Sequence, residues 1–219
     1  MTMSEPLLPT RFLFRFAVPC LYKTPLWTPQ GAALEEKHRL ASFAELEGRP
    51  ATAEVRAAWS EAGLALAVRV QGKRQPPWCR ASRCEDSDGV QVWIDTRDVH
   101  NVHRAGRFCH RFLFLPSGHP GRLDEPVAEM LPIHRAREQP RPVPAGAVGV
   151  RSEKRADGYL LEAFLAAEAL TGFDPQEHPR LGFTYAVVDR ELGEQTFGVG
   201  SPMPYQEDPS LWATLELVR

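Results

Sequence analysis

The sequence predicts an all-β fold, an antiparallel β-sandwich of jelly-roll type. Two features of the composition and one pattern indicate this class. The 219 residues contain 20 Pro and 16 Gly, and between these breaks lie short runs in which apolar and polar residues alternate. In the run 90–95, for example, Val90, Val92 and Ile94 point to one face, the period-two pattern of a half-buried strand. No long run has the 3.6-residue period of an amphipathic helix.

The predicted strands follow one another along the chain with turn residues between them, as in a meander of hairpins. We expect strands at Phe12–Ala17, Ala53–Trp59, Leu64–Gln71, Val90–Asp95, Phe108–Leu115, Val148–Glu153, Gly158–Leu165, Gly182–Val188, Gln195–Gly198 and Leu211–Val218. One short helical turn is expected at Ala166–Leu170. Trp59, Trp93 and Trp212 lie in these strands or at their ends, where large aromatic residues fill a core.

Two turns and one long connection have recognisable chemistry. Gly63 and Gly158 stand where a tight hairpin turn requires positive φ, so each joins its neighbouring strands as an antiparallel pair. The stretch 116–144 contains Pro at several positions, and each Pro removes a hydrogen-bond donor from a sheet. We therefore expect a surface loop there, with at most an edge strand at Val127–Ile133.

Composition excludes several classes of protein. The formal net charge is -2, so the chain lacks the broad positive field of a nucleic-acid-binding protein. No segment approaches the roughly 18 consecutive apolar residues of a membrane span, and the start of the chain does not resemble a secretion signal. The four cysteines form no CxxC pair and are expected to be reduced. These observations predict a single cytoplasmic domain over residues 1–219 that binds neither nucleic acid nor membrane.

A set of short motifs gives the chain a family resemblance. In order, these are Pro77-Trp78, the segment 87–95 (SDGVQVWID), the segment 157–163 (DGYLLEA), Leu181-Gly182-Phe183 with Asp189, and Asp208-Pro209-Ser210. Over residues 53–218 the chain resembles family 9 carbohydrate-binding modules and the wider DOMON-like β-sandwich group. The resemblance implies a non-catalytic β-sandwich that binds a saccharide or a similar small polar ligand.

The same resemblance implies a set of ligand-binding residues. In the family a sugar lies between two aromatic rings, which correspond here to Trp78 and, displaced by one residue, Tyr205. Arg111 and Gln91 match the polar groups that hold the sugar hydroxyls. Two further family amides fall near Leu113 and Ala186, so part of the hydroxyl-binding polarity is lost and a different ligand is an open alternative.

A second cluster of residues offers metal-binding groups. His100, His103 and His110, with Asp95 and Cys109, lie within a short stretch that a strand return at Phe108 folds back on itself. His-x-x-His in a loop is not the helical spacing that places two imidazoles on one metal. A hydrogen-bonded loop is therefore the favoured interpretation of this cluster. A transition-metal site, and with it a metal-dependent enzyme, is kept as the alternative.

Other features leave the function open. The acidic turn 85–88 offers oxygen ligands for a structural Ca²⁺, yet it lacks the spacing of an EF-hand loop. No cofactor is required, because the sequence contains no nucleophile elbow, phosphate-binding glycine loop or dinucleotide motif. Whether the chain is an enzyme is left open, with a binding domain favoured, and an accessory domain that contacts other proteins through its Pro-rich loop is a further alternative.

Overall fold

A computed structural model of the chain describes residues 15–43, 48, 50–201 and 203–219. Eleven strands are present among these residues: β1 (Ala17–Tyr22), β2 (Ala53–Ser60), β3 (Gly63–Gln71), β4 (Gly89–Asp95), β5 (Cys109–Leu115), β6 (Val127–Leu131), β7 (Val148–Arg155), β8 (Gly158–Ala166), β9 (Arg180–Asp189), β10 (Gly193–Thr196) and β11 (Ala213–Val218). Four short 3₁₀ helices accompany them: η2 (Glu36–His38), η4 (Ala81–Asp86), η5 (Ala167–Ala169) and η6 (Pro209–Leu211). Within the described ranges, no helix has the length and apolar character needed to cross a membrane.

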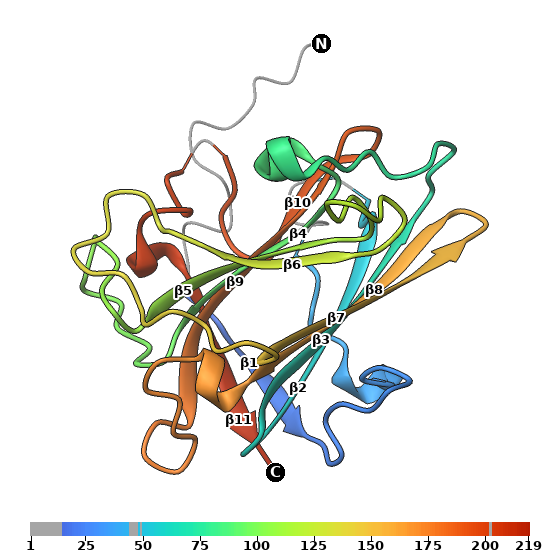
Figure 1. Cartoon of the computed structure of the whole chain (residues 1–219). Helices are drawn as coiled ribbons and strands as arrows, with labels where there is room; N and C mark the ends of the chain where they lie inside the picture. The colour runs from blue at the N-terminus through green and yellow to red at the C-terminus, as the bar shows by residue number, and fades with distance from the viewer. Residues whose placement is uncertain (1–14, 44–47, 49, 202) are drawn as a thin grey trace.

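The strands form a β-sandwich, which confirms the predicted fold class (Figure 1). Their hydrogen-bonded order is β6-β5-β4-β9-β11-β1-β2-β3-β8-β7, and β10 pairs with β9. The end strands β6 and β7 contact one another, so the sheet nearly closes on itself. The main core lies inside and draws on both halves of the order, for example Val92 and Phe112 from one half with Val68 and Leu161 from the other.

Most predicted strands are confirmed to within two residues, and so is the edge strand in the Pro-rich region, where β6 pairs with β5. The meander is only part of the topology. Strand β1 runs parallel to both β11 and β2 and joins the two halves of the sandwich. Residues 12–14 of the predicted first strand, Phe12–Ala17, lie outside the described residues, and β1 starts at its last residue.

Pro19 explains why the sequence does not indicate β1. A proline inside a run argues against a central strand because it donates no hydrogen bond to the ladder. Only Leu21 and Tyr22 of β1 pair with β2. Pro19 therefore has a neighbouring strand on one side only, where it lies opposite Glu216 of β11. Strand β11 also starts later than expected, because Pro209–Leu211 forms η6, in which the Asp208 side chain accepts the Ser210 N–H.

A second apolar cluster covers the outer face of β4 and β5. The half-buried pattern predicted for β4 is therefore wrong, because all seven of its residues are buried. Trp93 and Trp212 pack there with Tyr205 and Val199, under the loops that lead into β5 and β11. All three tryptophans predicted in the core are buried. Trp59 belongs to the main core, and the other two belong to the second apolar cluster.

The hairpin between β2 and β3 gives a direct test of the predicted turn chemistry. Gly63 has φ +136°, and a Cβ there would overlap the carbonyl oxygen of Leu165. Gly63→Ala is expected to lower the free energy of unfolding by about 2 kcal/mol or more, from backbone strain and overpacking together. Gly193→Ala is the control: its φ is +89° and no atom lies within 4 Å, so only strain of about 1 kcal/mol applies. Equal losses in urea unfolding would contradict the steric argument.

Candidate functional site

The candidate site centres on Trp78, which lies half-buried in the connection between β3 and η4. Asp88, just before β4, fixes the backbone of Trp78 from both sides. Its side-chain Oδ2 accepts the Trp78 N–H at 3.0 Å, and its own N–H donates to the Trp78 carbonyl at 2.9 Å. The indole is therefore held at a set place beside the sheet although it stands in a loop.

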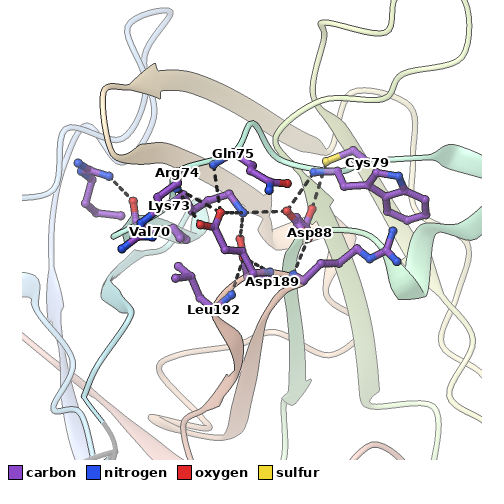
Figure 2. A network of polar contacts seen from close by, with 12 residues as sticks. Val70, Lys73, Arg74, Gln75, Cys79, Asp88, Asp189 and Leu192 are labelled. Carbon is purple, nitrogen blue, oxygen red and sulfur yellow. Dashed lines mark hydrogen bonds and ion pairs between the residues drawn. The ribbon is translucent and has the colours of Figure 1, made fainter.

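A buried ion network holds Asp88 itself. The Lys73 ammonium donates to Asp88 Oδ2 at 3.0 Å and to Asp189 Oδ2 at 2.5 Å, and all three side chains are buried (Figure 2). Asp189 Oδ1 accepts the N–H groups of Glu191 and Leu192. Burial alone lowers the pKa of Lys73, but its hydrogen bonds to Asp189 and Asp88 outweigh this and raise the pKa above its usual value.

The same network also holds the turn between β9 and β10 close to Trp78. Asp88 Oδ1 accepts the N–H of Arg190, in the turn between β9 and β10. The guanidinium carbon of Arg190 then lies 4.2 Å from the centre of the indole. Arg80 and Arg83, from the segment that contains η4, lie 5.3 Å and 5.9 Å from it. Trp78 is thus an aromatic ring approached by three cations.

Arg111 and Gln91 form a pair, in agreement with their expected proximity. The Arg111 guanidinium donates to Gln91 Oε1 through Nε at 3.2 Å and Nη2 at 2.6 Å, and it lies 5.4 Å from the Trp93 ring. Arg111 is only 8% exposed, and Glu85 of η4 forms an ion pair with its Nη2 at 2.8 Å. The pair therefore lies beneath a carboxylate of the same chain.

Tyr205 does not occupy the open position that the resemblance implies. It is 2% exposed, its ring packs edge-on against Trp93 at 5.4 Å, and its hydroxyl donates to Glu194 Oε1 at 2.6 Å. The Trp212 indole N–H also donates to its carbonyl, which ties the loop to the second apolar cluster. A ring buried in this way presents no face to a sugar, so the expected two-ring clamp is not formed.

The histidines of the second cluster point in different directions. His110 is buried, accepts the Thr171 N–H at 2.8 Å and stacks on Phe112, and burial lowers its pKa to about 4. His100 contacts Asp98 and Thr214, whereas the side chain of His103 is 76% exposed and meets Asp208. Among the described residues, no three His, Cys, Asp or Glu side chains gather as metal ligands. The strand return does place His110 opposite Ile94, beside Asp95, as the sequence suggested, but the three histidines have separate partners.

The two other members of that cluster have structural partners. The Asp95 carboxylate accepts the N–H groups of Arg97 and Val99, and burial raises its pKa. Burial, with the charge of Asp95 beside it, raises the pKa of Cys109 to about 12, so its thiol is not a ready metal ligand. In the acidic turn, Asp88 already accepts from Lys73 and from two backbone amides, which are the contacts a structural Ca²⁺ would have to replace.

A pocket of about 670 Å³ lies apart from Trp78, lined by His100, His103, Asp208, Ser210 and Trp212 among others. It contains a Ser, a His and an Asp in contact. However, Ser210 Oγ and Asp208 Oδ2 both meet the same nitrogen of His103, Nδ1, at 3.1 Å. In a catalytic relay the two ring nitrogens serve different partners. Ser210 Oγ instead donates to Asp208 Oδ1 at 2.7 Å, so this arrangement does not activate the serine.

Sequence reasoning missed Lys73 and Arg190, and it considered Glu85 only as an oxygen ligand for Ca²⁺, not as the partner of Arg111. Nothing in the local sequence marks Lys73, because its partners lie 15 and 116 residues away in the chain. Arg190 directly follows Asp189, which the family motif includes, and that adjacency was the one available signal.

Comparisons with known proteins agree on the fold. No family model matches the sequence, and the curated proteins contain no significant match. Among solved structures, the chain is similar to a family 9 carbohydrate-binding module from Caldicellulosiruptor kristjanssonii in complex with cellotriose, with a TM-score of 0.59, 13% identity and coverage of 93% of this chain and 94% of that one. It is also similar to a family 9 module from the same organism in complex with glucose, with a TM-score of 0.58 and 14% identity. That match covers 92% of this chain and 95% of that one. At this identity the likeness shows a shared β-sandwich.

The ion network can be tested by removing its cation. Lys73→Met leaves two buried carboxylates without their counter-ion and is expected to lower the free energy of unfolding by about 3–5 kcal/mol. Lys37→Met is the matched control, since Lys37 pairs with Glu35 on the surface at 3.4 Å and its loss should cost less than about 1 kcal/mol. Chemical denaturation measures both, and similar costs would show that the buried network does not stabilise the fold.

Proposed function

We propose that this chain is a non-catalytic carbohydrate-binding domain and that a saccharide stacks on Trp78. The observation that carries this proposal is a half-buried indole, held by Asp88 through two backbone hydrogen bonds, on a fold shared with family 9 modules. A fixed aromatic face suits the C–H side of a pyranose, because little conformational entropy is lost when the sugar packs on it.

Arg111 and Gln91 are the candidates for orienting the sugar. Both come from neighbouring strands, β4 and β5, and their side chains are already paired, so their geometry is set before a ligand arrives. Glu85 competes for the same guanidinium. Its side chain is largely exposed and belongs to a short 3₁₀ segment, so we propose that a sugar hydroxyl replaces this carboxylate on binding.

The position of Tyr205 limits the site to one platform. Its buried ring supports Trp93 beneath Arg111 and does not face a ligand. Binding to a single ring is weaker than binding between two, because only one face of the sugar is removed from water. We therefore propose a low-affinity site whose specificity depends on the charged groups around Trp78.

Trp78→Ala tests the platform. It should weaken saccharide binding by about 1 kcal/mol or more, at least fivefold in Kd, while urea unfolding shows an intact fold. Trp27→Ala is the control: this second half-buried indole stacks on Phe164 in another apolar cluster and should not affect binding. Titration calorimetry with panels of neutral and acidic oligosaccharides gives the measurement. Unchanged binding by Trp78→Ala, or an unfolded variant, would remove Trp78 from the site.

Glu85→Gln tests the orienting role of Arg111. Removing the carboxylate charge weakens the ion pair at 2.8 Å and frees guanidinium donors. If Arg111 binds the sugar, the variant should bind severalfold more tightly, because less of the pairing energy is lost on binding. Glu216→Gln, which removes an exposed carboxylate charge paired with Arg180 at the opposite end of β9, is the matched control for the change in surface charge. A binding constant that Glu85→Gln leaves unaltered would assign Arg111 a structural role alone.

A further inference from the structure

We infer that the sugar bound at Trp78 is acidic: a pyranose that carries a carboxylate or another anionic group. The inference rests on the proposed function, because it names the class of saccharide for the same site. It comes from the guanidinium groups around the ring and from the pairing of the acids near them.

Three cations approach the indole, and two of them have no acidic partner among the described residues. Arg83 pairs with Asp86 at 2.7 Å. Within the part of the chain that the structure describes, the guanidinium groups of Arg80 and Arg190 make neither an ion pair nor a hydrogen bond with a protein acceptor, and their contact is with the Trp78 ring. Both residues are exposed.

The acids close to this ring are already bonded elsewhere. Asp88 and Asp189 share Lys73, and Glu85 pairs with Arg111. Glu191 accepts the backbone N–H groups of Arg74 and Gln75, which lowers its pKa and keeps it on that loop. The two free guanidiniums are therefore available to an acceptor that comes from outside the chain.

Their backbones are fixed, so each arginine side chain starts from a set position close to the ring. The Arg190 N–H donates to Asp88 Oδ1 at 2.9 Å, and the Arg80 N–H donates to Ser87 Oγ at 2.9 Å. Both contacts belong to the acidic turn that also holds Trp78. One short segment thus places an aromatic face and two free cations together.

This combination suits an anionic sugar better than a neutral one. A guanidinium presents two parallel N–H groups to a carboxylate, sulfate or phosphate, and such charged hydrogen bonds are about twice as strong as neutral ones. The indole contacts the C–H face of the same ring. A neutral hexose offers these guanidiniums only hydroxyl oxygens and no opposite charge, so it gains less from them than an anionic sugar does.

The experiment compares sugars that differ only in charge. Glucose, galactose and mannose are titrated against the corresponding hexuronates and hexose 6-sulfates by calorimetry, with the full chain and with the double variant Arg80→Gln/Arg190→Gln. Both replacements keep the backbone contacts. Arg219→Gln is the matched control, since Arg219 is an exposed arginine that pairs with Glu61 away from Trp78.

At least one acidic sugar is expected to bind about tenfold or more tightly than its neutral counterpart. The difference should disappear in the double variant, persist in Arg219→Gln, and shrink as NaCl is raised from about 0.05 to 0.5 M, because salt screens exposed charges. A preference for uronates or for sulfates identifies the anionic group, and either supports the inference. Hexoses that bind through Trp78 as tightly as the acidic sugars would overturn the inference alone. Binding of no sugar would overturn the proposed function as well.

Discussion

The geometry of the candidate site depends on the ion network of Lys73, Asp88 and Asp189. Burying three charges costs several kcal/mol per ion unless each finds close partners. Here Asp88 and Asp189 both contact the ammonium, and their remaining acceptor capacity is taken by backbone amides of Trp78, Arg190, Glu191 and Leu192. Because these amides belong to two separate loops, the network sets the position of each loop relative to the other.

The position of the loops determines what the site can bind. The connection after β3 supplies Trp78 and Arg80, and the β9–β10 turn supplies Arg190. Without the shared carboxylate of Asp88, nothing among the described contacts would bring Arg190 to 4.2 Å from the indole. A charge network that contributes little net stability can therefore still determine which surface groups stand together.

Much of the fold could be predicted from the sequence, because strand alternation and turn glycines are local features. Gly63 and Gly158 mark their hairpins directly, and the apolar residues of β4 face the main core as their spacing indicates. The extent of strand β1 beyond Ala17 and its parallel pairing could not be predicted, because its partners are distant and Pro19 argues against a strand. The pairing of Arg111 with Gln91 was predictable only through family resemblance.

The errors at the site come from contacts that loops make with the sheet. Tyr205 precedes the expected Asp-Pro-Ser turn, yet the loop folds its ring onto Trp93, where the hydroxyl meets Glu194. The histidines are close in sequence, but His110 is on a strand and points into the buried interior while His103 is on the surface. Neither direction follows from spacing, since it depends on which face of β5 is covered and by which loop.

The covered face of β4 and β5 affects which groups the proposed site can offer to a sugar. Leu113 and Ala186 stand near positions where the resemblance places sugar-binding amides, and both are buried and apolar. Leu113, Ala186 and the inward-turned Tyr205 therefore offer no hydrogen-bonding side chain or open ring to a sugar at these positions. The polar groups that do remain near Trp78 are mostly guanidiniums. For the acidic sugar that we infer, these guanidiniums would add charged hydrogen bonds to the stacking contact on Trp78.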